Sequence, residues 1–261
     1  MDCYYCSYAA FFNLNFKNNM KKVQLSFCLF LIASALQAQV TIGPKIGLNV
    51  NYESFQFSGN YSGTSVSSRT AKVGYQAGLA INVKTSDYFS IRPEVLFNVM
   101  GGDTKFGDNN NNSISIKNTY NYLSVPLNFV GTFQAGPGKI NVFVAPQFSL
   151  GLSGKYSQTS DSSGVFVTAQ SSQSGMLQTG NVPSNNNSST RYFNQMSWGM
   201  NYGIGYQVGG LLFSGQYHMG ITNTQPHYAD SNQESHRNDV VSKNYGFTVG
   251  LTYFFGDTKN E

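Results

Sequence analysis

The segment Asn244-Tyr-Gly-Phe-Thr-Val-Gly-Leu-Thr-Tyr-Phe-Phe255 decides the fold. Large apolar residues occupy every second position, and small or polar residues fill the positions between them. A period of two predicts a β-strand with one apolar face and one polar face. The apolar face carries Tyr245, Phe247, Val249, Leu251, Tyr253 and Phe255. An aromatic-rich strand near the end of a chain is typical of the strand that closes a transmembrane β-barrel.

The same alternation recurs in seven segments upstream of this strand. Each is long enough for the 9–11 residues, roughly, that a membrane-crossing strand needs. We expect strands at residues 40–52, 71–84, 88–100, 118–133, 139–156, 192–207 and 211–222.

The connections between these segments alternate strictly between long polar loops and tight turns. Bacterial outer-membrane barrels have this asymmetry, with an even number of strands. The sequence therefore predicts an all-β fold, an eight-stranded antiparallel up-and-down transmembrane β-barrel over residues 39–256, with a polar tail at 257–261. The long loops are expected at 53–70, 101–117, 157–191 and 223–243, and the tight turns at 85–87, 134–138 and 208–210.

Composition fits this fold and excludes other classes. Charged residues make up only 11% of the chain and aromatic residues 15%. The mean hydropathy of -0.26 excludes a helical membrane bundle, but strands that alternate average out to such values. From Gln39 onward the net charge is +2, with 13 Lys and Arg against 11 Asp and Glu, which is not the basic footprint of a nucleic-acid-binding protein.

The N-terminal region has the features of a secretory signal peptide. Met20 is followed by two lysines, an apolar run from Val23 to Leu36 and a small-residue exit, the order that such signals share. We predict cleavage between Ala38 and Gln39, with Ala35 as the alternative site, and translation starting at Met20. Residues 1–38 are then an N-terminal extension plus the signal. All three cysteines lie in this region, so the predicted mature chain has no disulfide framework.

Several short motifs carry a resemblance to a known family. They are Gly47-Leu48-Asn49, Arg92-Pro93-Glu94, Tyr122-Leu123-Ser124-Val125-Pro126-Leu127 and the ending Gly-Leu-Thr-Tyr-Phe-Phe. In this order they resemble the PorT-like outer-membrane β-barrel proteins of Bacteroidota, over most of residues 40–256. The resemblance implies an eight-stranded barrel related in shape to the OmpA and OmpX barrels. It does not imply the secretion role of the founding member.

The polar face of the strands predicts the contents of the lumen. An eight-stranded barrel has an interior just wide enough for side chains, so a structural polar filling is the first interpretation, and a selectivity ring for ions is the second. The central polar cluster is predicted to contain Lys45, Arg92, Glu94 and His218. The other polar residues expected inside are Asn49, Lys72, Gln76, Asn82, Asn98, Asn128, Asn141, Gln147, Lys155, Asn201, Gln207 and Gln216.

Three features resemble chemical sites, and each also has a simpler structural interpretation. His218 lacks an Asp or Ser partner at a fixed spacing, so we expect a structural histidine rather than a catalytic one. His227 and His236 share a loop with three acidic residues but match no zinc pattern. Asp103 and the run Asp108-Asn109-Asn110 lack the spacing of an EF-hand. We therefore predict no catalytic residue, cofactor or metal site.

The sequence favours a structural or interaction protein that works through its long loops. The alternatives are a narrow channel for small solutes or ions and, less favoured, a lipid-modifying enzyme centred on His218. A soluble lipocalin-like barrel is the rival fold. The expected surroundings are the bacterial outer membrane, with extracellular loops and periplasmic termini. We expect a monomer that contacts membrane lipid, the barrel-assembly machinery and an extracellular or envelope protein. The predicted signal for assembly consists of Gly250, Leu251, Tyr253 and Phe255 in the closing strand.

Overall fold

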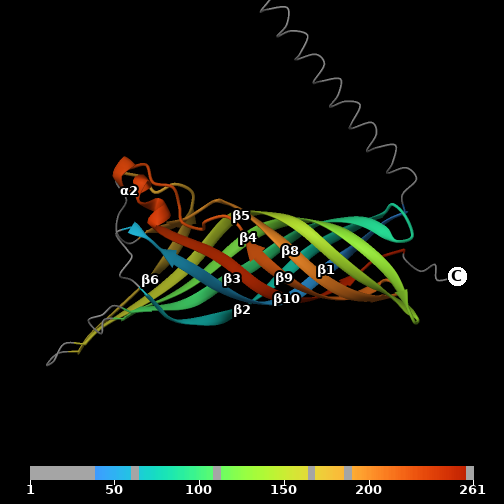
Figure 1. Ribbon diagram of the computed structural model, residues 1–261, viewed down its shortest axis with the longest axis horizontal. Helices are drawn as coiled ribbons and strands as arrows, with labels where there is room; N and C mark the ends of the chain where they lie inside the picture. The colour runs from blue at the N-terminus through green and yellow to red at the C-terminus, as the bar shows by residue number, and fades with distance from the viewer. Residues whose placement is uncertain (1–38, 60–64, 108–112, 164–167, 185–189, 257–261) are drawn as a thin grey trace, which may run out of the picture.

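The protein is a β-barrel with a small helical loop at one end (Figure 1). The computed structural model describes residues 39–59, 65–107, 113–163, 168–184 and 190–256. Within them are an α-helix, α2 (Ser231–Ser235), and a 3-10 helix, η2 (Arg237–Asp239). The strands are β1 (Gln39–Phe57), β2 (Ser65–Lys84), β3 (Phe89–Gly107), β4 (Ser113–Ala135), β5 (Gly138–Ser163), β6 (Thr168–Thr179), β7 (Arg191–Phe193), β8 (Met196–Val208), β9 (Leu211–Gly220) and β10 (Val240–Tyr253).

Eight of the ten described strands close into a ring. The order around it is β1-β2-β3-β4-β5-β8-β9-β10, every neighbouring pair is antiparallel, and β10 returns to β1. Closure leaves no unpaired strand edge within the ring, which lipid requires because it offers no hydrogen bonds to the backbone. The expected fold class and the pairing of the last strand with the first are therefore confirmed.

The predicted apolar face points out of the barrel. Its height can be measured on β1, between Ile42, which bridges to Phe255, and Tyr52, whose ring stacks on Tyr245 at 5.5 Å between centroids. Ten residues at about 3.3 Å each, tilted by about 40°, give a band about 25 Å tall. That is the thickness of the apolar band of outer-membrane barrels, and aromatic residues bound it at both levels. Between these levels Ile46, Leu48 and Val50 are all exposed.

The strands continue well beyond this band at the end where the long connections lie, called the loop end below. The strand β5 has 26 residues and β4 has 23, although about 9–11 suffice to cross the membrane. The expected loops 53–70 and 101–117 are therefore largely strand, and the expectation for them was wrong. Part of 223–243 is also ordered, as α2, η2 and the start of β10.

The largest departure lies in residues 157–191, which we expected to be an unpatterned loop. Here β5 continues to Ser163 and pairs with β6 as an antiparallel hairpin, and β7 pairs with the last three residues of β6. The hairpin projects past the barrel at the loop end (Figure 1). The strand expected at 192–207 is in fact split, because β8 begins only at Met196.

A β-bulge overturns one lumen assignment. Asn121 of β4 pairs with Ser153, whereas the next residue, Tyr122, pairs with Gly151, so Leu152 is an extra residue in β5. Because side chains alternate with a period of two, one inserted residue exchanges the two faces of the strand. Lys155 is therefore exposed rather than in the lumen, and Tyr156 is buried inside at 3% exposure.

Prolines within strands do not shift the register. Pro93 pairs with Leu127, and Pro126 with Gln147, in the registers of their neighbours, and the peptide bonds are not cis. The pairing instead lapses for two residues beside each proline, as expected when a ladder donor is missing. Within the described residues, none of the helices is long and apolar enough to span a membrane.

Candidate functional site at the loop end of the barrel

The lumen is filled by polar side chains, and its central contact is an ion pair. Lys45 Nζ lies 2.7 Å from Glu94 Oε2, and each side chain is only 3% exposed. The two residues come from β1 and β3, which flank β2. Lys45 pairs with Gly78 of β2, which has no side chain, and the next residue of β2 on this face, Ala80, pairs with Glu94. Most other residues expected inside are buried: Asn49, Gln76, Asn98, Asn128, Asn141, Gln147, Asn201, Gln207 and Gln216.

The four residues of the predicted central cluster do not form one site. Arg92 lies nearer the end that carries the tight turns, where its guanidinium stacks over the Phe254 ring at 5.1 Å and its Nε donates to Asn82 Oδ1 at 3.3 Å. His218 lies on β9, where its Nδ1 is 2.7 Å from Asn201 Oδ1. Only Lys45 and Glu94 are joined in an ion pair. The histidine is thus placed in an amide network, without an acidic partner among the hydrogen bonds of the described residues.

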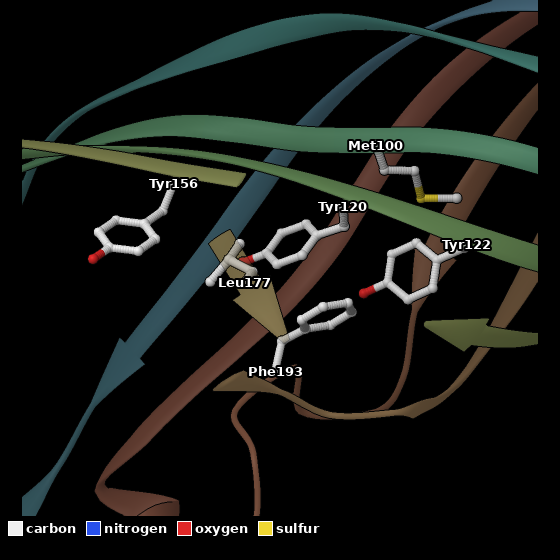
Figure 2. Close-up of a cluster of buried hydrophobic side chains, with 6 residues drawn as sticks. All are labelled: Met100, Tyr120, Tyr122, Tyr156, Leu177 and Phe193. Carbon is white, nitrogen blue, oxygen red and sulfur yellow. The ribbon is translucent and has the colours of Figure 1, made fainter. Parts of the chain in front are cut away.

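A cluster of buried side chains, most of them aromatic, lies toward the loop end of the barrel (Figure 2). The ring of Phe193 lies 5.0 Å from that of Tyr120 and 5.8 Å from that of Tyr122, between centroids. Phe193 comes from β7, so the segment after the hairpin folds back over the barrel mouth. We call this group the plug; its members are Met100, Tyr120, Tyr122, Tyr156, Leu177 and Phe193, each at most 5% exposed.

The sequence carried a signal for part of this plug. Tyr120 and Tyr122 alternate with Leu123, which we placed outside, so the same period puts the two tyrosines inside. Phe193 lies in the strand expected at 192–207, at the same period as Asn201 and Gln207, so it too had a signal, whereas Leu177 lies in a segment that we expected to be a loop. The plug differs from the expected polar interior, because large rings rather than amides fill the lumen at this level.

A carboxyl group lies buried beside the plug. Glu53 of β1 is 1% exposed. Its Oε2 accepts a hydrogen bond from Asn118 Nδ2 at 3.0 Å, and the Tyr120 hydroxyl also hydrogen-bonds to the carboxyl group. Gly102 of β3 makes room for it, since a Cβ there would lie 2.8 Å from the Glu53 backbone nitrogen. This acid was not among the residues predicted inside the barrel, because residue 53 was assigned to a loop.

The loop that carries α2 is held by its own polar contacts. Asp230 caps α2 by accepting hydrogen bonds from two backbone N–H groups, at 3.0 Å each. Glu234 accepts from the Tyr228 backbone N–H at 2.7 Å and lies 2.8 Å from His227 Nδ1. These two contacts, the backbone one first, lower the pKa of Glu234 below its ordinary value.

The two loop histidines belong to separate pairs. His236 Nδ1 lies 3.0 Å from Asp239, whereas His227 faces Glu234. In the part of the chain that the structure describes, no three His, Cys, Asp or Glu side chains are grouped as a metal would require. The second half of the possible calcium segment, Asp108-Asn109-Asn110, lies outside the described residues.

Of the residues predicted for processing and assembly, those that the structure describes lie at the other end of the barrel. Ala38 and the whole segment 1–38 are outside the described residues, as is the tail 257–261, and Gln39 is the first residue of β1. Phe255 is 58% exposed and its backbone N–H donates to the Ile42 carbonyl at 2.9 Å. Tyr253 packs edge-on against it at 5.2 Å, Leu251 is half-buried on the outer face, and Gly250 is buried. Their role in assembly stays a prediction.

The hairpin of β5 and β6 ends in an open strand edge. On one side of β6, residues 168–177 pair with β5, but on the other side only residues 177–179 pair, with β7. Residues 168–176 therefore present one row of backbone N–H and C=O groups with no partner strand in the described sheet. The whole of β6 contains neither a charged residue nor a proline.

A closed eight-stranded ring with an apolar band and a filled polar lumen is the architecture of a small transmembrane β-barrel. The sequence places the chain in such a family, since the model of the family described as "Outer membrane protein beta-barrel domain" matches residues 34–225. The chain belongs to this family. It is an outer-membrane β-barrel protein, as expected, and the lipocalin-like alternative is excluded.

Several solved barrels are similar to this chain in outline. Ail, the attachment invasion locus protein of Yersinia pestis, is 10% identical, with 83% of this chain and 99% of that chain covered and a TM-score of 0.37. Neisserial surface protein A is 10% identical, with 82% and 98% covered and a TM-score of 0.36. OprG from Pseudomonas aeruginosa is 12% identical, with 84% and 96% covered and a TM-score of 0.39. The comparison with curated proteins finds no match.

Proposed function

We propose that this protein is an interaction barrel, which uses the open edge of β6 at the loop end to bind a strand of a partner protein. The observation that carries the proposal is the edge itself. An unpaired strand edge is a template for another chain, and proteins usually blunt it with charges, prolines or bulges. Residues 168–176 have no charge and no proline, so this edge is left open to strand addition, a common mode of peptide recognition.

The closed lumen supports an interaction role over transport. A narrow channel would have to pass the Lys45–Glu94 pair and then the plug. The plug residues are at most 5% exposed, so a solute that passed this level would have to displace buried side chains. The channel therefore stands as the second candidate, since the polar lumen below the plug favours it, and opening would require the plug to move.

The proposal includes an orientation in the membrane. The first described residue, Gln39, pairs with Lys84 beside one tight turn, and the last residue of β10, Tyr253, pairs with Leu211 beside another. In bacterial outer-membrane barrels the short turns are periplasmic and the long loops extracellular. On this basis the loop end, with the hairpin and α2, faces the outside, and the protein is inserted by the barrel-assembly machinery as a monomer.

Two finer assignments belong to the same proposal. Within the family, the motifs Arg92-Pro93-Glu94 and Tyr122 to Leu127 favour the PorT-like group. A role other than catalysis is favoured because His218 faces Asn201 rather than a carboxylate.

Labelling of single cysteines tests the orientation and the contact together. The chain from Gln39 onward contains no cysteine, so Ser172→Cys places a unique thiol on the hairpin. Ser86→Cys, on an exposed tight turn, is the matched control. In intact cells a membrane-impermeant maleimide should label the first variant and not the second. The reverse pattern would overturn the orientation.

A thiol-linked photocrosslinker on Ser172→Cys then tests partner binding. We expect a defined adduct that disappears when Ser171 and Gln173 are both changed to lysine, because charge on an edge opposes strand addition. Replacing residues 159–172 by Asn-Gly, with the thiol moved to Ser174→Cys, should also remove the adduct. The Asn-Gly turn suits a two-residue hairpin, so the barrel should still migrate heat-modifiably. An adduct that survives both changes would contradict the proposal.

A further inference from the structure

A small cavity lies on the loop-end side of the plug. Its volume is about 130 Å³. Rings form much of its wall, with Phe55 from β1, Tyr120 from β4 and Phe193 from β7 among the lining residues. Figure 2 shows two of these rings, Tyr120 and Phe193, facing each other beside Leu177. An engineered apolar cavity of about 150 Å³ accepts benzene, so this one is close to the size that holds a single six-membered ring.

The cavity also carries a buried hydroxyl group that its own walls do not satisfy. Ser242 is 1% exposed, lines the cavity, and its hydroxyl has no hydrogen-bond partner within the described part of the chain. Buried polar groups are nearly always paired with protein, water or a ligand. Asn118, Thr224 and Gln225 add further amide and hydroxyl groups to the lining.

A positively charged side chain in the cavity wall favours a negatively charged ligand. Arg191 lines the cavity, lies over the Tyr156 ring at 4.3 Å and donates to the Gln158 side chain. A guanidinium has five N–H donors in a planar fork that matches a carboxylate. None of the residues that line the cavity is acidic, and Asn118, which does line it, donates to the Glu53 carboxylate.

We propose that this cavity binds a small molecule made of one six-membered ring bearing a carboxylate. The ring packs between the aromatic walls, the carboxylate meets the guanidinium of Arg191, and ring substituents reach the Ser242 hydroxyl. An aromatic acid and an acidic sugar share this chemistry. The site is independent of the β6 edge, since it lies within the barrel mouth.

Calorimetric titration of the full barrel in detergent micelles tests the proposal. The probes are benzoate and glucuronate, each with a neutral counterpart of similar shape, benzamide and glucose. We expect at least one acid to saturate the protein below about 10 mM, and at least about tenfold more tightly than its neutral counterpart, because a charged hydrogen bond is worth that much or more. Benzoate alone would identify an aromatic acid, and glucuronate alone an acidic sugar.

Substitutions at Arg191 locate the binding. Arg191→Gln should abolish the preference for the acid over the neutral probe, and Arg191→Lys should retain part of it, because lysine keeps the charge but loses the fork. Arg69→Gln, on the exposed outer part of β2, is the matched control and should change nothing. Equal affinity for acid and neutral probes, no saturation by either acid, or an equal effect of the two glutamine variants would overturn the proposal. The hairpin replacement at 159–172 keeps Gln158 and Arg191, so it should bind the acid normally.

Discussion

At the scale of single residues, the pair of Lys45 and Glu94 illustrates what holds a narrow lumen together. Both charges are out of water, so each depends on the other for compensation. Attraction inside a protein roughly offsets the cost of removing two ions from water. The pair is therefore expected to add little net stability while being costly to break.

Removing one partner of this pair is the first prediction. Lys45→Met should lower the free energy of unfolding by about 3–5 kcal/mol, because it leaves a buried, uncompensated carboxylate. Equilibrium unfolding in urea, followed by tryptophan fluorescence from Trp198, measures the change. The double variant Lys45→Met/Glu94→Leu should recover most of the loss. If the double variant were as unstable as the single one, packing rather than charge would explain the effect.

Sequence alone could place Lys45 and Glu94 inside, because their strands alternate without interruption. It could not place Lys155, because the extra residue Leu152 exchanges the faces of β5, and a bulge has no reliable sequence pattern. Glu53 was missed for a different reason. The outward residues beyond Tyr52 turn polar where β1 leaves the apolar band, so the alternation that would have shown a strand is lost.

At the scale of elements, the closing strand β10 carries the second prediction. Phe255 is 58% exposed on the outer face at the turn end, so it adds nothing to the core, and its loss should cost little stability. If it belongs to the assembly signal, Phe255→Ala should reduce the amount of inserted, heat-modifiable protein far more than removal of residues 257–261. Outer-membrane fractionation measures this. The opposite ranking would place the signal in the tail.

The loop that carries α2 gives the third prediction, which concerns pH. The pKa of Glu234 is held below its ordinary value of 4.5, first by the Tyr228 backbone N–H and then by His227. A carboxylate whose pKa is lowered by folding stabilises the loop fully above that ordinary value, and the contribution is lost as pH falls through the lower value in the folded loop. Hydrogen exchange of the Tyr228 amide, corrected for its intrinsic rate, should therefore show weaker protection in acid.

A substitution isolates this effect. Glu234→Gln should remove the pH dependence of Tyr228 protection, since an amide does not titrate in this range. Asp87→Asn, in an exposed tight turn at the opposite end, is the control and should leave it intact. Unchanged pH dependence in Glu234→Gln would assign the acid sensitivity to another group of the loop.

The element that sequence reasoning missed altogether is β6. A strand is recognised by alternation only when one of its faces is buried, and Ser171 to Ser174 are all exposed. Nothing in their composition distinguishes such a strand from a polar loop. The membrane strands have one face in lipid and one in the lumen, so their alternation is strong. Their ends at the tight turns were predicted to within two residues, but their ends at the loop side were wrong by up to seven.

At the scale of the whole molecule, the architecture followed from the alternation and from the spacing of loops and turns. The length of the barrel could not be predicted in this way. Strand segments outside the membrane do not have one face in lipid, so their residues need not alternate between apolar and polar. The plug was likewise beyond prediction, since it joins Tyr120 of the wall to Phe193, which follows a hairpin that the sequence does not announce. Strands that extend beyond the apolar band and a lumen occupied by the plug are consistent with a protein that binds a partner through its loop end.

The last prediction separates that role from transport. In planar bilayers the intact barrel should show no conductance above a lipid control, because the plug seals the lumen above the Lys45–Glu94 pair. Leu177→Ala/Phe193→Ala removes two plug side chains and should produce small channels, whose conductance changes again with Glu94→Gln as the lumen charge changes. The exposed pair Met196→Ala/Phe213→Ala is the control and should stay silent. Conductance in the unmodified protein that responds to Glu94→Gln would instead establish the channel and leave the β6 edge a secondary feature.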